Sequence, residues 1–239
     1  MEQMGFFQLM GFGPGGWGPA LLQGATMTVA VAGAGFIIGG TLGALAARAR
    51  IAGGRTLAGL ATAYTTILRG IPDLLVIYLF YFGGSVFLTR IAGWAGHEGF
   101  VDLPGFAAGA MAIGIVSGAQ HAEVFRGAWS AVNRGEVEAA LAVGMRPAVL
   151  FRRIVLPLVA RHALPGMGNV WQITLKESAL VSVTGVVELL RQAQIGAGST
   201  REPFYFFFAA ALLYLAITSI SGFGFGRAET HFSRGIRRV

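Results

Sequence analysis

The sequence predicts an all-α integral membrane protein that forms one transmembrane domain over residues 1–239. Of these residues, 54% are hydrophobic and only 12% are charged, whereas a soluble domain has about 25% charged residues. Five apolar segments are long enough to cross a bilayer, which takes about 20 apolar residues. The formal net charge of +7 comes from arginines between these segments, so it indicates membrane topology and not nucleic-acid binding.

The predicted spans are, in order, about residues 19–47, 57–88, 106–125, 155–175 and 203–225. The second is too long for one straight span. It contains Gly70-Ile71-Pro72, where the proline removes a backbone donor, so we expect a kink or a break there. The fourth is only weakly hydrophobic and is expected to face other protein or water, because it contains Arg161, His162, Pro165, Asn169 and Gln172.

The arginines give the orientation of these spans, because cytoplasmic flanks carry an excess of Lys and Arg. Thirteen arginines lie on one set of flanks, and three lie on the other set: Arg90, Arg191 and Arg201. The N-terminus is therefore expected outside the cell and the C-terminus in the cytoplasm. The loop of about residues 134–153, between the third and fourth spans, is also expected in the cytoplasm.

This cytoplasmic loop has the composition of a short polar helix that could dock on a partner. Two carboxylates at its start suit the positive end of a helix dipole. Two alanines follow, whose small side chains project little from the helix surface. A glycine then permits a turn into a second short helix. An ordinary interfacial helix between two spans is the alternative. The candidate docking residues are Glu136, Glu138, Ala139, Ala140, Gly144 and Arg146.

Polar residues inside the predicted spans are candidates for a solute pathway, because burying them in lipid is costly. Asn169, Gln172 and Lys176 have the spacing i, i+3, i+7 and lie on one helical face; they could instead satisfy one another or a neighbouring subunit. Glu177 is a further pathway candidate, with pairing of Lys176 and Glu177 at the membrane edge as the alternative. Gln120 belongs to the third span, on the same helix as Glu123.

Two pairs of opposite charges are expected to be structural. Glu123 precedes Arg126 by three residues, which favours an ion pair at the cytoplasmic end of the third span. Arg69 and Asp73 flank the Gly-Ile-Pro break at i, i+4 and could neutralise each other there while positioning the helix. Direct contact of Arg69 and Asp73 with a substrate is the alternative, so both stay among the pathway candidates.

Motifs for enzymatic chemistry are missing from the sequence. It has no cysteine, and its four histidines have no metal-ligand spacing. A P-loop needs a Gly-rich turn followed by Lys-Ser/Thr, but the only lysine lies in Leu175-Lys176-Glu177. The chain is therefore expected to bind no metal or cofactor itself and to hydrolyse no ATP.

The cytoplasmic loop resembles the EAA loop of permease subunits of ABC importers, through Glu138-Ala139-Ala140, Gly144 and Ile154-Val155-Leu156-Pro157. Other segments are similar to permeases for polar amino acids: Arg69–Asp73, Glu123–Gly127, Arg161–Pro165, Asn169–Gln172 and Leu175–Leu180. The stretch Gly198–Tyr205 is similar to subunits for histidine, lysine-arginine-ornithine and opine uptake. This chain has Gln120-His121 where the group often has a tyrosine.

The resemblance implies the type I ABC importer permease fold, in a multi-pass subunit of the bacterial inner membrane. It implies four kinds of partner: a second homologous permease subunit, identical or not; two ATP-binding subunits, which hold ATP and Mg; a periplasmic solute-binding protein; and a small polar amino acid as substrate. It also implies that residues 134–153 dock in a groove of the ATP-binding subunit. Import of polar amino acids, with basic ones or opines favoured, would proceed by alternating access.

Two other functional classes compete with this interpretation. A secondary transporter or channel that works alone would need coupling-ion carboxylates at mid-membrane and often has an internal repeat, and neither stands out here. A membrane-embedded enzyme would need a nucleophile with its base, or a metal site.

Overall fold

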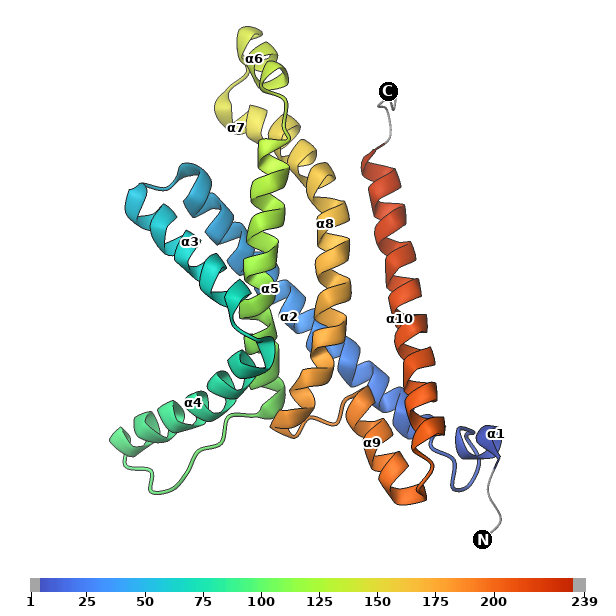
Figure 1. The fold of residues 1–239 in the computed structure, drawn as a ribbon. Helices are drawn as coiled ribbons and strands as arrows, with labels where there is room; N and C mark the ends of the chain where they lie inside the picture. Colours follow the sequence, from blue (N-terminus) through green and yellow to red (C-terminus); the bar gives the residue numbers. More distant parts are fainter. Residues whose placement is uncertain (1–4, 234–239) are drawn as a thin grey trace.

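The computed structural model describes residues 5–233 and is all-helical there, as predicted (Figure 1). The helices are α1 (Phe6–Leu9), α2 (Gly18–Ala52), α3 (Arg55–Gly70), α4 (Asp73–Trp94), α5 (Gly105–Ser130), α6 (Arg134–Ala142), α7 (Pro147–Leu150), a π-helical turn (Phe151–Val155), α8 (Leu156–Glu177), a 3₁₀-helix (Ser178–Thr184), α9 (Leu189–Thr200) and α10 (Pro203–Phe232).

Three of these helices, α2, α4 and α10, are long and apolar enough to cross a membrane by length and composition. The helices form an open bundle in which α8 packs against both α5 and α10. In Figure 1, α6 and α7 lie at the same end of the bundle as the C-terminal end of α10, and α9 and the N-terminal end of α2 lie at the other. The bundle therefore has two distinct ends, joined by long helices.

The second predicted span is broken, as its Gly-Ile-Pro sequence indicated. Helix α3 ends at Gly70, Ile71 has an extended backbone with φ −104° and ψ 137°, and α4 begins at Asp73. Pro72 has no N–H group and fixes its own φ, so the chain restarts as a separate helix in a new direction. The consequence is that Arg69 and Asp73 belong to different helices.

Helices α2 and α5 pack against each other more extensively than any other pair of helices in the described residues. Gly39 and Gly43 of α2 are buried and face α5. A Cβ atom on Gly39 would overlap Ser117 Oγ and would lie only 3.0 Å from the backbone oxygen of Gly114. The Ser117 hydroxyl is 3.3 Å from the carbonyl oxygen of Gly35, to which it donates. Small residues let helix backbones approach closely, and such packing is a main source of helix association in lipid.

A buried carboxylate ties α9 to two long helices. Glu188 precedes α9 and accepts hydrogen bonds from the backbone N–H groups of Leu190 (2.8 Å) and Arg191 (2.7 Å), so it caps this helix. The same carboxylate accepts from Thr28 of α2 (3.4 Å) and from Tyr214 of α10 (3.1 Å). Because Glu188 is fully buried, these four donors compensate for its removal from water.

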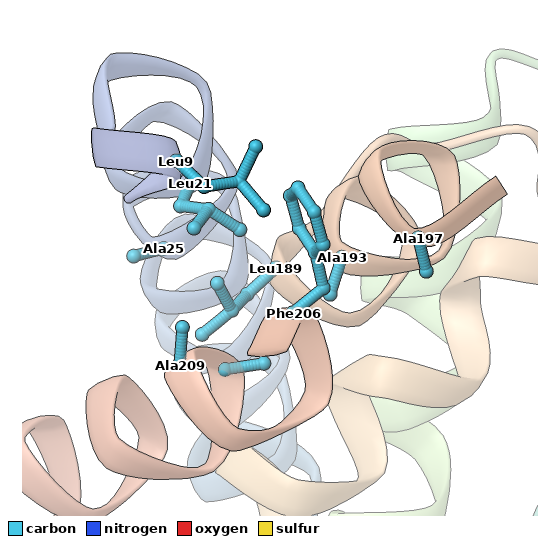
Figure 2. Close-up of a cluster of buried hydrophobic side chains, with 9 residues drawn as sticks. Leu9, Leu21, Ala25, Leu189, Ala193, Ala197, Phe206 and Ala209 are labelled. Carbon is cyan, nitrogen blue, oxygen red and sulfur yellow. The ribbon is translucent and has the colours of Figure 1, made fainter. Parts of the chain in front are cut away.

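An apolar cluster surrounds this junction at the end of the bundle that carries α9 (Figure 2). The ring of Phe206, at the start of α10, contacts Gly196 of α9, where any side chain would collide with it. Leu21 of α2 and Leu9 of the N-terminal segment belong to the same cluster. The cluster therefore fixes α9 relative to the N-terminal ends of α2 and α10.

Replacement of Gly39 by alanine tests the close approach of α2 and α5. We expect Gly39→Ala to destabilise the protein by about 1–3 kcal/mol, because the added methyl group overpacks the contact. Gly40→Ala is the matched control, since a Cβ atom there meets nothing within 4 Å. Thermal unfolding of the purified protein in lipid nanodiscs should show a lower melting temperature for the first variant only; equal melting temperatures would contradict the packing.

Candidate functional site

A cavity of about 430 Å³ lies where the α3–α4 break meets α5 and α8. Four of the predicted pathway residues line it: Arg69 lies in the last turn of α3, Asp73 begins α4, Gln120 belongs to α5 and Asn169 to α8. The other lining residues include apolar side chains such as Val116 and Ile173. Three separate segments of sequence thus bring polar groups to one space inside the bundle.

The predicted ion pair between Arg69 and Asp73 is not formed, and this expectation was wrong. Among the described residues, both salt bridges within 4.0 Å involve Glu123 and neither involves Asp73. An i, i+4 pair meets on the surface of one continuous helix, whereas the break at Ile71 and Pro72 places these two residues on different helices. Both charges instead face the same cavity.

Glu177 adds a second carboxyl group beside this cavity. It lies near the side chains of Asp73 and Gln120. Its Oε2 atom and the Oε1 atom of Gln120 are buried and have no hydrogen-bond partner among the described residues. The alternative in which Glu177 pairs with Lys176 is not realised, because Lys176 is exposed and neither salt bridge includes it.

Gln172 does not share the cavity with Asn169. Its amide nitrogen points toward the position of Gly222 on α10, while Asn169 lines the cavity. The spacing correctly puts Asn169, Gln172 and Lys176 on one side of α8, but α8 is wedged between α5 and α10. One side of this helix therefore meets two different neighbours, which periodicity alone does not reveal.

Glu123 is the centre of a three-residue charge cluster. The predicted pair is confirmed: Arg126 donates to Oε2 of Glu123 from Nε (3.1 Å) and Nη2 (2.9 Å). Sequence reasoning missed the second partner, Arg50 at the end of α2, whose Nη1 donates to Oε1 of Glu123 and lies 3.5 Å from Thr65 Oγ1 on α3. The only available signal was that Arg50 and Glu123 both lie near the predicted cytoplasmic ends of their spans.

A second, smaller cavity of about 330 Å³ adjoins this cluster. It is lined by Arg50, Thr65 and Thr66, and two residues line both cavities: Arg69 and Glu123. Glu123 is already balanced by two arginines, so it adds no free negative charge to either cavity. Arg69 lines both cavities and belongs to neither of the two salt bridges in the described residues.

The predicted docking loop forms a compact hairpin of α6 and α7 beyond the ends of α5 and α8 (Figure 1). Asn133 caps α6, because its Oδ1 accepts from the N–H of Gly135 (2.9 Å). At the other end Gly144 has φ +77°, which glycine adopts without strain. The N–H of Met145 donates to the carbonyl of Ala140 (3.1 Å), as in a Schellman motif.

The hairpin has a small core of its own, which changes the predicted docking surface. Ala140 is only 5% exposed and packs with Leu150 and Val155, so its prediction as a surface residue was wrong. Glu136, Glu138, Ala139, Gly144 and Arg146 are exposed, as expected. Two exposed apolar side chains were not predicted: Leu141 (52% exposed) and Val143 (79% exposed), which lie between Ala139 and Gly144. The end of α6 is therefore an apolar surface with carboxylates beside it.

Within residues 5–233, no group of three or more His, Asp or Glu side chains is arranged to hold a metal ion.

Comparisons with known proteins agree with this geometry. Residues 39–232 match the model of the family described as binding-protein-dependent transport system inner membrane component. The octopine transport system permease protein OccQ of Rhizobium meliloti is 57% identical over 98% of this chain and 99% of its own length. The histidine/lysine/arginine/ornithine transport system permease protein HisQ of Salmonella typhimurium is 36% identical over 94% and 98%.

Solved structures of ABC transporters also resemble this chain. A crystal structure of an amino acid ABC transporter with histidines matches 90% of this chain and 95% of its own, at 30% identity and a TM-score of 0.76. The methionine ABC transporter MetNI in an inward-facing conformation matches at 19% identity and a TM-score of 0.67, and so supports the fold alone. The resemblance found in the sequence is confirmed: this chain belongs to the family of binding-protein-dependent transport system inner membrane components.

Proposed function

We propose that this chain is the transmembrane subunit of an ABC importer that moves basic amino acids or opines into the cytoplasm. The names of its relatives support this substrate class, because they include octopine, nopaline and histidine/lysine/arginine/ornithine permeases that align over nearly their whole length. The polar cavity and the hairpin supply the two parts that such a subunit needs, a route for solute and a contact for a motor.

The proposed topology has five crossings, with the N-terminus in the periplasm and the C-terminus in the cytoplasm. The crossings are α2, α3 with α4 as one broken span, α5, α8 and α10. The C-terminal ends of α2, α5 and α10, which carry Arg50, Arg126 and Arg227, lie toward the hairpin (Figure 1), which suits the cytoplasmic side of a bacterial inner membrane. Arg69 and Asp73, on either side of Pro72, line the cavity, and non-helical backbone is tolerated within a span where it borders a cavity.

The proposed assembly contains a second homologous permease subunit, two ATP-binding subunits that carry ATP and Mg, and a periplasmic solute-binding protein. The ATP-binding subunit would contact the hairpin, with exposed Leu141 and Val143 as the apolar centre and Glu138 at its edge. An exposed apolar surface with a polar rim is typical of a protein interface.

One observation carries the mechanism: the hairpin is continuous with both helices that line the cavity. Gln120 lies 10 residues before the end of α5, and Asn169 lies 13 residues after the start of α8, about 15 and 20 Å of helix at 1.5 Å per residue. A displacement of the hairpin by the ATP-binding subunits therefore acts on the cavity through two stiff helices. This connection is what alternating access requires of a motor-driven permease.

A stand-alone secondary transporter or channel remains the competing function, and removal of the motor separates the two. In a proteoliposome assay that is supplied with solute-binding protein, uptake should require the ATP-binding subunits and ATP. Uptake that continues without them would favour the stand-alone function.

Glu138→Arg tests the hairpin as the motor contact. We expect uptake and binding-protein-stimulated ATPase activity to fall by about tenfold or more, because the substitution reverses a charge at the edge of the apolar surface. Glu98→Arg is the matched control, since Glu98 is also exposed but lies in the α4–α5 loop away from the hairpin. If Glu138→Arg were as active as this control, the hairpin would not be the contact.

Asn169→Ala and Gln172→Ala separate the cavity from the α8–α10 contact. We expect Asn169→Ala to raise the KM of uptake with unchanged assembly and melting temperature, because its side chain faces the cavity. Gln172→Ala should lower the melting temperature and leave KM unchanged, because its amide faces α10. The reverse assignment of the two effects in uptake and unfolding assays would show that the cavity is not on the pathway.

A further inference from the structure

The C-terminal end of α10 reaches beyond the apolar part of that helix. Helix α10 has 30 residues, which make about 45 Å at 1.5 Å per residue, whereas the hydrocarbon core of a bilayer is about 30 Å thick. No charged residue occurs from Pro203 to Gly226, and Arg227 is the first. In the proposed topology, Arg227 and the residues that follow it in α10 therefore lie at the level of the cytoplasmic lipid headgroups.

One face of this end combines a basic group, hydrogen-bond donors and an aromatic ring. Phe223, Arg227 and His231 have the spacing i, i+4, i+8, and Thr230 follows Arg227 by three residues on the same face. All four side chains are exposed. The guanidinium carbon of Arg227 lies 4.4 Å from the centroid of the Phe223 ring. This stacking holds the guanidinium group at the helix surface, where its N–H groups can meet an anion.

This face of α10 points away from the rest of the subunit. The opposite side of the helix meets α8: the ring of Phe225 lies against Gly168, and Gly222 lies beside the amide of Gln172. At 3.6 residues per turn, Arg227 is about 200° around the helix from Phe225. The face with Arg227 is therefore directed away from α8 and from the cavity that α8 lines.

The charge of this end favours an anionic partner. From Arg227 to the C-terminus the sequence has four arginines and one glutamate; three of these arginines, Arg234, Arg237 and Arg238, lie outside the described residues. Glu229 is about 200° around α10 from Arg227, and neither salt bridge among the described residues includes it. A cluster of four or more basic residues directly after a span, on the cytoplasmic side, is typical of a site for anionic phospholipids.

We propose that the C-terminal end of α10 binds an anionic phospholipid of the cytoplasmic leaflet. Arg227 holds the headgroup phosphate, Thr230 and His231 donate hydrogen bonds to it, and Phe223 packs against the start of the acyl chains. The inference rests on the proposed topology and goes beyond the proposed function, because it assigns a lipid site that the transport of solute does not require.

Two other occupants fit this face less well. A free anion such as phosphate would leave Phe223 uncovered, and this side chain is 63% exposed. An ATP-binding subunit would be expected at the hairpin, and α6 reaches farther from the bundle than the end of α10 does (Figure 1). A lipid covers the aromatic ring and the basic group together, since it carries acyl chains and a phosphate in one molecule.

The test measures lipid binding to the purified transporter complex by native mass spectrometry. The two probes are phosphatidylglycerol, which is anionic, and phosphatidylcholine, which is zwitterionic. We expect Arg227→Gln to weaken the tightest binding of phosphatidylglycerol by about fivefold, the effect of one basic residue at an anionic surface, and to leave phosphatidylcholine binding unchanged. Arg227→Lys keeps the charge and should retain most of the binding. Arg55→Gln is the matched control, because Arg55 is exposed and begins α3 on the same proposed side of the membrane.

Three results would overturn the lipid site. Equal weakening by Arg227→Gln and Arg55→Gln would mean that the surface charge attracts lipid without a specific site. Inorganic phosphate that displaces phosphatidylglycerol would assign Arg227 to a free anion. A complex with Arg227→Gln that loses its ATP-binding subunits but keeps its phosphatidylglycerol would assign this end of α10 to the motor. All three leave the proposed function standing, because uptake is not measured; a complex that binds the lipid as expected but imports no amino acid would overturn that function alone.

Discussion

The contact between α2 and α5 is the constraint on which the rest of the structure depends. Glycines of α2 let its backbone approach the buried residues Ser117 and His121 of α5 so closely that a single methyl group would not fit. This contact fixes the ends of both helices, so Arg50 of α2 reaches Glu123 of α5. The side of α5 away from the glycines is then free to line the cavity with Gln120 and to receive α8. Close packing of small residues thus sets where the polar groups meet.

The break at Ile71 and Pro72 gives the fold its functional asymmetry. A continuous helix would have placed Arg69 and Asp73 beside each other, and they would have neutralised each other. The break instead turns both into the cavity as separate charges. The same local sequence that ends α3 therefore brings two opposite charges to one cavity.

Much of this organisation can be predicted from the sequence, and most of the failures have a common physical cause. Local signals were reliable: Pro72 indicated the break, the Glu123–Arg126 spacing indicated an ion pair, and the residues from Glu136 to Gly144 indicated the hairpin. The sequence did not indicate which helices pack against each other. The Arg50–Glu123 pair, the turn of Gln172 toward α10 and the burial of Ala140 in the hairpin core all depend on which helices lie side by side, and periodicity within one helix carries no information about that.

The central claim is that the hairpin of α6 and α7 drives the cavity between two states through α5 and α8. The chain contains no cysteine, so a single cysteine in place of Ile173, which lines the cavity, reports access directly. Its reaction with a membrane-impermeant thiol reagent would be measured from each side of reconstituted vesicles, without nucleotide and with ATP trapped on the motor subunits. The account predicts that the reactive side changes between the two conditions. The same reactivity from the same side in both would contradict it.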